Sequence, residues 1–126
     1  MIDELFKALS EDSRLRILAL LQERELCVCE IEASLKMTQS NASRHLTILK
    51  RSGILDSYKQ AQWTYYKISE KFKADDYELW NYLQRNLKNI PTYGMDNDEY
   101  KKCEGQNLCC KNIINNSVNE RGNQYE

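Results

Sequence analysis

The sequence predicts a mainly α-helical fold that carries one small β-hairpin, which places it in the α+β class. Two observations predict this fold. Apolar residues recur at helical spacing through most of the first 90 residues, and a single stretch, residues 54–68, is instead rich in Tyr, Trp, Thr and Ile. A length of 126 residues is enough for one domain with one hydrophobic core.

Two short helices are predicted at the N-terminus, over residues 2–9 and 12–22. In the second of them Leu15, Leu18 and Leu21 recur at helical spacing and form an apolar stripe. We therefore expect this helix to bury one face.

A helix-turn-helix pattern follows. A third helix of about two turns covers residues 27–35, and a fourth runs to Ser52 and stops at Gly53, a residue suited to a left-handed helix end. On the fourth helix apolar residues lie on one side and polar residues on the other, namely Ala42, Leu46 and Leu49 against Ser40, Ser43, Arg44, Thr47 and Arg51. A short helix, a tight turn and a polar-faced second helix are typical of DNA-reading units.

The stretch over residues 54–68 predicts two strands around a turn near residues 60–62, with Tyr66 and Ile68 facing the core. A last amphipathic helix is predicted over residues 74–88, with Leu79, Leu83 and Leu87 on one side. This helix carries more apolar surface than a small domain can cover. We therefore expect it to pack on a second copy of the chain, in a homodimer.

The composition changes at Pro91. Residues 91–126 contain seven Asn and few large apolar side chains, although Cys103, Cys109 and Cys110 lie among them. The sequence thus predicts a folded domain over residues 1–90 and a polar, flexible, cysteine-containing tail over 91–126.

The charges are separated along the chain. Residues 36–67 carry six basic side chains and one acidic side chain, a sum of +5, whereas residues 1–35 sum to −4. A basic block inside a chain of net charge −1 indicates a polyanionic partner, and nucleic acid is the partner that the helix-turn-helix pattern favours.

The polar face of the fourth helix contains side chains suited to reading bases in a major groove, because Arg pairs with guanine and Asn or Gln with adenine. Base-contact candidates are Gln39, Ser40, Asn41, Ser43 and Arg44, and candidates for phosphate or minor-groove contacts are Lys50, Arg51, Lys59 and Gln60. His45 lies toward the apolar side, so both core packing and a phosphate contact are open to it.

The cysteines indicate thiol chemistry rather than a disulfide framework. Five is an odd number, and the chain shows neither a membrane-length apolar run nor a secretory signal. We expect a cytoplasmic protein, where thiols are kept reduced, with no membrane partner. A set of thiols without His or carboxylate partners favours soft ions over hard ones.

Cys27 and Cys29 stand two positions apart at the start of the predicted third helix, where helix geometry turns their side chains about 200° from each other. Two thiols on opposite sides of a helix share one ion only if the first turn unwinds. Ion capture would then deform the helix-turn-helix.

A resemblance to the ArsR/SmtB winged-helix repressors over about residues 4–88 is carried by three stretches: FKALSEDSRLRILALL, ELCVCEIEASLKMTQSNASRHLTILKRSGIL and a strand pair ending WTYYKIS. Its ELCVC box is similar to that of arsenite-responsive members, and cadmium- and lead-responsive members carry a similar box. The resemblance implies a dimeric winged helix-turn-helix protein with its first and last helices at the interface.

The resemblance also implies repression of a resistance operon through double-stranded promoter DNA. Release follows when an ion is captured by thiolates that include Cys27 and Cys29. As(III) is the expected inducer, with Sb(III) as a close analogue and Cd(II) or Pb(II) as alternatives.

The sequence departs from the family pattern at Glu32, where many arsenite-responsive members have a third cysteine. Two arrangements therefore remain open. Cys27 and Cys29 can join a tail cysteine, or Cys103, Cys109 and Cys110 can bind the ion alone. A redox switch through disulfides is a further alternative. An enzyme is not expected, because acidic residues flank Cys27 and no C-x-x-C or phosphate-binding loop is present.

Overall fold

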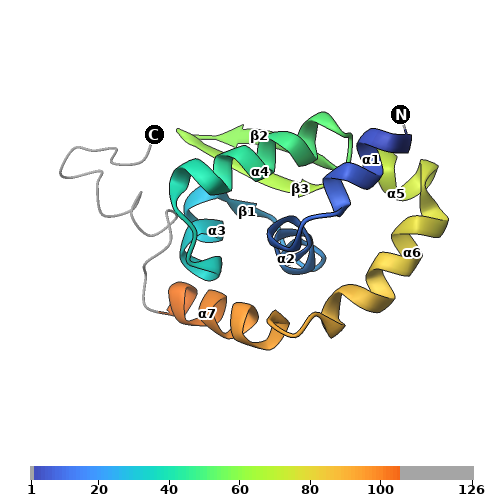
Figure 1. Ribbon diagram of the computed structural model, residues 1–126. Coiled ribbons are helices and arrows are strands. Elements are labelled where there is room, and N and C mark those ends of the chain that lie inside the picture. Colours follow the sequence, from blue (N-terminus) through green and yellow to red (C-terminus); the bar gives the residue numbers. More distant parts are fainter. Residues whose placement is uncertain (1, 106–126) are drawn as a thin grey trace.

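The computed structural model describes residues 2–105 and has the predicted fold class: helices with one antiparallel sheet of three strands, in the order β1-β3-β2. Figure 1 shows α2 at the centre, with the sheet on one side and the C-terminal elements in an arc around the other. The elements are α1 (Ile2–Leu9), α2 (Asp12–Leu21), β1 (Leu26–Cys27), α3 (Val28–Leu35), α4 (Gln39–Arg51), β2 (Leu55–Gln60), β3 (Trp63–Ile68), α5 (Glu70–Asp75), α6 (Tyr77–Asn86), η1 (Leu87–Asn89) and α7 (Tyr93–Gly105).

The core forms around α2. Ile17, Leu18 and Leu20 are each no more than 1% exposed, and they belong to one apolar cluster with Leu46 of α4 and Leu83 of α6. A helix buried on so much of its circumference fixes the positions of the elements around it. Within residues 2–105 no helix combines the length and apolar character needed to cross a membrane.

The helix-turn-helix predicted from the sequence is present as α3 and α4. Lys36 ends α3 in the left-handed conformation with φ of 56°, and the Thr38 side chain accepts a hydrogen bond from the Asn41 amide to begin α4. Gly53 follows α4 with φ of +89°, as expected for a left-handed terminator. The two helices are therefore separated by a tight, locally specified turn.

The predicted hairpin is present, and a strand that we did not predict joins it. β2 and β3 pair from Leu55 opposite Ile68 to Gln60 opposite Trp63, so the turn falls at residues 61–62. The additional strand, β1, pairs antiparallel with β3 and sets Cys27 opposite Tyr65. Because β3 is the central strand, the hairpin is attached through β1 to the start of α3.

The last predicted helix, over residues 74–88, is wrong in its bounds. The structure has α5 and α6 instead, separated by Asp76, whose φ of −113° and ψ of 45° lie outside the helical region. The Ser69 side chain caps α5 by accepting a hydrogen bond from the Phe72 amide, so α5 begins at Glu70, four residues before the predicted start. Of the predicted leucine stripe, Leu83 and Leu87 are buried.

The prediction of a flexible tail from residue 91 is wrong for residues 93–105, which form α7. Figure 1 shows α7 beside α3, and α7 also contacts α2. This helix has little amphipathic character in its sequence, but it buries Asp96 and Cys103 at 2% and 3% exposure. Its docking combines the packing of Tyr93 and Tyr100 against the main core with polar contacts, which a search for apolar periodicity does not detect.

Arg14 of α2 joins α1 to α4. Its Nε donates to the Ala8 carbonyl oxygen at 2.7 Å, and its Nη1 lies 3.1 Å from Nδ1 of His45. The guanidinium group thus satisfies a carbonyl at the end of α1 while holding the buried face of α4. Both partners are buried, so the contact has little competition from water.

A test of this contact follows from the titration of His45. Burial lowers its pKa; Glu11 opposes that shift, and the guanidinium groups of Arg44 and Arg14 add to it. The unfolded chain therefore takes up this proton more readily, so the free energy of unfolding should decrease as the pH falls from about 7.5 through the ordinary histidine range near 6.5. His45→Asn keeps an acceptor near Arg14 but does not titrate, and it should flatten that part of the curve. Urea unfolding between about pH 5.5 and 7.5 checks this, and equal pH slopes in the two proteins would contradict it.

Candidate nucleic-acid interface and thiol site

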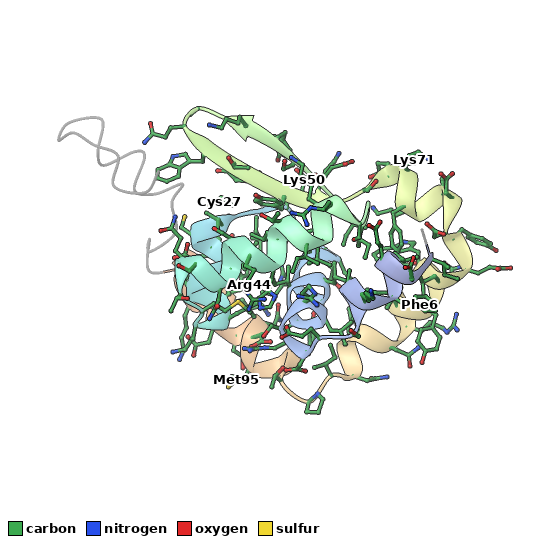
Figure 2. The ribbon with its side chains drawn as sticks, turned by 45° about the horizontal axis from the view of Figure 1, so that its top comes forward. Phe6, Cys27, Arg44, Lys50, Lys71 and Met95 are labelled. Atoms are coloured by element: carbon green, nitrogen blue, oxygen red, sulfur yellow. The ribbon has the colours of Figure 1, made fainter. Side chains whose placement is uncertain are left out.

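The polar side of α4 is open to solvent. All five predicted base-contact residues, Gln39, Ser40, Asn41, Ser43 and Arg44, are exposed. Figure 2 shows Arg44 and Lys50 on α4 with Cys27 on the neighbouring β1. No acidic residue occurs between Gln39 and Arg51, so the face presents cations and hydrogen-bonding groups without a carboxylate among them.

The basic residues beyond the base-contact face lie on two elements. Lys50 of α4 donates from Nζ to the Ser57 hydroxyl of β2 at 2.6 Å, which ties the helix to the hairpin. Lys59 and Gln60 are exposed at the end of β2, next to the turn. Arg51 is also exposed, and it lines a cavity of about 260 Å³ together with residues of α1.

His45 does not belong to this face, which corrects its inclusion among the predicted DNA contacts. The side chain is 3% exposed and bonded to Arg14, with Nε2 3.6 Å from a carboxylate oxygen of Glu11. Its place on the apolar side of α4 sends it into the core. Of the two roles left open by the sequence, core packing is the one observed.

The relative positions of the Cys27 and Cys29 side chains differ from the sequence prediction. The sulfur atoms of Cys27 and Cys29 lie 3.0 Å apart, not on opposite sides of a helix. Cys27 is the residue before α3, with φ of −87° and ψ of 168°, because β1 holds it in an extended conformation. The helical rotation of 100° per residue therefore does not apply to it. No unwinding is needed to bring the two sulfur atoms together.

The start of α3 is closed by a capping box built on a cysteine. The Cys27 side chain accepts from the Glu30 amide, and the Glu30 carboxylate accepts from the Cys27 amide at 2.9 Å. Glu30 is 2% exposed, so this carboxylate contributes negative charge inside the protein, close to the sulfur atoms.

Two aromatic residues of β3 enclose the side chains of Cys27 and Cys29. Cys27, Cys29, Trp63 and Tyr65 form a buried cluster separate from the main core. The pKa of Tyr65 is raised, chiefly by burial and further by the neighbouring Glu30 and Cys29. Tyr58 of β2 stacks on Tyr65 with ring centroids 5.6 Å apart. The thiols thus lie directly beneath the hairpin.

Tyr58 closes this side of the cluster through the segment before β1. Its hydroxyl donates to Glu25 at 2.5 Å, and this hydrogen bond is the main cause that raises the pKa of Tyr58 to about 12. The hairpin is thus bonded twice to the segment that leads into the two box cysteines, by the pairing of β1 with β3 and by the hydrogen bond from Tyr58 to Glu25.

Helix α7 approaches the same region with Cys103. Tyr100, one turn earlier, lies near Glu30, whose charge contributes to raising the tyrosine pKa after the larger effect of burial and a contribution from Glu104. The structure records disulfide bonds at Cys27 and at Cys103, whereas Cys29 is a buried thiol. Among residues 2–105 no three Cys, His, Asp or Glu side chains already form a metal-binding group.

The other predicted ligands fall elsewhere. Cys109 and Cys110 lie outside the described residues, so the arrangement that uses the three tail cysteines alone stays a prediction. Glu32, at the family's third cysteine position, is partly exposed, and burial raises its pKa.

Sequence reasoning missed the aromatic wall, the capping box and the ion pair that docks α7. The capping box had a signal, since Cys27 and Glu30 have the spacing of a Ser-x-x-Glu box with sulfur in place of the hydroxyl. The docking pair, Arg16 with Asp96, had none, because its members are 80 residues apart.

Known proteins resemble this chain in sequence and in fold. Residues 11–57 match the family described as "Bacterial regulatory protein, arsR family". The arsenical resistance operon repressor of Escherichia coli K12 is 43% identical over 72 residues, which make up 56% of this chain but only 62% of that repressor. The arsenic resistance transcriptional regulator ArsR2 of Pseudomonas putida KT2440 is 33% identical over 113 residues, or 85% of this chain and 96% of that protein.

Among solved structures, a homodimeric winged helix-turn-helix DNA-binding domain from Mycobacterium bovis, described as a possible ArsR-family regulator, matches with a TM-score of 0.58. It is 28% identical, and the match covers 70% of this chain and 82% of that domain.

Proposed function

This chain belongs to the ArsR family of bacterial regulatory proteins, and on that basis we propose that it is a metalloid-responsive repressor of an arsenic-resistance operon. Proteins of this family are DNA-binding regulators of transcription and not enzymes. In the proposal the protein binds promoter DNA in the cytoplasm, and As(III) bound by cysteine thiolates releases it.

The observation that carries the proposal is the pairing of the Cys27 and Cys29 sulfur atoms, which lie 3.0 Å apart and are buried at the start of α3, beneath the hairpin. Trivalent arsenic is a soft centre that binds three thiolates as a pyramid, and soft ligands select soft ions. Once the disulfide bond at Cys27 is reduced, the buried pair supplies two of the three bonds, and a wall of Trp63 and Tyr65 excludes competing water.

Cys103 is the third thiolate in this proposal. The proposal is supported by the packing of α7 on α3 and by the burial of Cys103 one helical turn beyond Tyr100. Sb(III) has the same valence and preference for sulfur, so it should be bound in the same way. Cd(II) or Pb(II) would leave a net negative charge on three thiolates beside the buried Glu30 carboxylate, so these ions are the second candidates.

The structural change caused by inducer binding would pass to the DNA-binding face through β1. Cys27 pairs with Tyr65 on the central strand and also caps α3. A change in the position of its sulfur atom would therefore displace both the hairpin and α3. A coupling free energy of about 1–3 kcal/mol between the two ligands is enough to change the affinity for DNA five- to 150-fold.

The DNA face in this proposal consists of the exposed side of α4 and the hairpin. Arg44→Ala should weaken specific binding about five- to 150-fold, because a bidentate Arg–guanine contact is worth about 1–3 kcal/mol. Lys73→Ala, outside the basic block, should change binding by less than about twofold. Fluorescence anisotropy with labelled promoter DNA measures both, and equal effects would refute the assignment of the face.

If six phosphates are contacted, the affinity for DNA should fall about 10³-fold between 50 and 200 mM salt.

A homodimer is proposed from the apolar surface at the start of α1 and on α6. Ile2, Phe6, Tyr77 and Tyr82 are each more than half exposed, and a groove of about 550 Å³ lies between α1 and the α5–α6 junction. Surface of this kind, contributed by two elements, is typical of an interface.

Phe6→Glu should therefore shift the protein toward the monomer and weaken DNA binding, because charge would be buried at the interface. Met95→Glu is the matched control, since Met95 is 56% exposed on α7, away from that groove. Analytical ultracentrifugation reports the association state. A Phe6→Glu dimer as tight as the wild type would disprove this interface.

The thiol assignment is tested by single Cys→Ser variants. Cys27→Ser, Cys29→Ser and Cys103→Ser should each raise the arsenite concentration for half-release from DNA at least tenfold, while DNA binding without arsenite stays within about threefold. Arsenic absorption spectroscopy of the loaded wild type should count three sulfur ligands. If the Cys27 and Cys29 variants leave DNA at the wild-type arsenite concentration, the box is packing only and the tail cysteines are the sensor.

A second candidate is a redox switch, favoured by the disulfide bonds recorded at Cys27 and Cys103. A peroxide would oxidise two thiols to a disulfide and be reduced to water in the process. Titration with arsenite under strong reductant separates the two functions, because a protein that responds only to oxidation stays on DNA.

A further inference from the structure

A buried ion pair joins helix α7 to α2. Arg16 of α2 donates from Nε to Oδ2 of Asp96 at 3.0 Å and from Nη2 to Oδ1 at 2.8 Å, so the pair is bidentate. The same Nη2 donates to the Leu35 carbonyl oxygen at the end of α3 at 3.3 Å. One guanidinium group therefore joins α2, α3 and α7.

The pair is far from an ordinary surface contact. The Asp96 side chain is 3% exposed and that of Arg16 is 18% exposed. The hydrogen bonding of Arg16 to the Asp96 carboxylate is the largest of the effects that raise the pKa of Arg16. Removing one partner of such a pair leaves the other charge poorly solvated, which makes the docked state of α7 strongly dependent on it.

The remaining contacts define how α7 runs. Glu99 lies 3.6 Å from Lys36, just after α3, and Tyr100 is near Glu30 in the first turn of α3. Successive residues of α7 thus meet earlier residues of α3, so the two helices are antiparallel. Cys103 follows Tyr100 by about 4.5 Å along the axis, on the same side of the helix, toward the start of α3 where Cys27 lies.

We propose that Arg16 and Asp96 are positioning residues for inducer binding, because their ion pair holds α7 in the register that presents Cys103 to Cys27 and Cys29. This inference rests on the proposed function and adds to it a residue pair that touches neither the inducer nor DNA. It makes α7 a preorganised arm of the thiol site, since the third ligand is then supplied without ordering a segment of chain at the moment of binding.

Asp96→Asn tests the pair, because it removes the charge and one acceptor while keeping the shape. In the full-length, reduced protein it should raise the arsenite concentration for half-release at least about tenfold. Glu99→Gln is the matched control: the same chemical change on the same helix, at an ion pair with an exposed lysine, should have an effect below about twofold.

The double variant Asp96→Asn with Cys103→Ser distinguishes positioning from general destabilisation. If Asp96 acts through Cys103, the double variant should need no more arsenite than Cys103→Ser alone. Additive losses, or an Asp96→Asn protein released at the wild-type arsenite concentration, would overturn the proposal. Should Asp96→Asn fail to bind DNA without arsenite, Arg16→Lys replaces it, since it keeps the charge but loses the bidentate geometry.

A readout without arsenite separates this inference from the proposed function. Asp96→Asn should speed the alkylation of reduced Cys103 by iodoacetamide at least about tenfold, measured by peptide mass spectrometry, because undocking exposes the thiol. An unchanged rate overturns the positioning role even if the wild type responds to arsenite. A wild type that stays on DNA in arsenite overturns the proposed function instead.

Discussion

The pairing of β1 with β3 is the constraint on which the site depends. Two residues of chain, Leu26 and Cys27, are held extended against the central strand before α3 begins. Because Cys27 is extended rather than helical, its sulfur atom lies next to that of Cys29. Both side chains then lie beneath the aromatic residues of the hairpin. Without the pairing, a helix begun two residues earlier would separate the sulfur atoms.

Much of the fold was predictable because its elements have local signals. Neighbouring residues in the sequence determine the apolar periodicity of α2, the turn before α4 and the glycine after α4. All three were predicted. β1 was not, since a strand of two residues is determined by its partner, which lies about 40 residues later. The bounds of α5 and α6 were missed because Ser69 caps a helix earlier than the leucine stripe begins.

The site was predicted in composition and only in part in geometry. Residue types alone identified the exposed polar face of α4 and the two box cysteines. The helical model misplaced Cys27, and the buried environment of His45 came from its place on the apolar side of α4, which the sequence left open. The docking of α7 could not be predicted, because an ion pair between residues 80 apart leaves no periodic trace in the sequence. Buried polar contacts of this kind specify one register more sharply than apolar packing does.

The end of α4 has a mechanical consequence. Gly53 turns the chain directly into β2, the Ile54 amide bonds back to the Leu49 carbonyl oxygen, and Lys50 reaches Ser57 across the junction. Short connections braced by hydrogen bonds transmit rotation rather than absorb it. The helix and hairpin therefore move as one stiff unit. Because the cysteine cluster includes Trp63, next to the hairpin turn, a tilt imposed there on the hairpin also turns α4, so affinity for a duplex can be lost while every element stays folded.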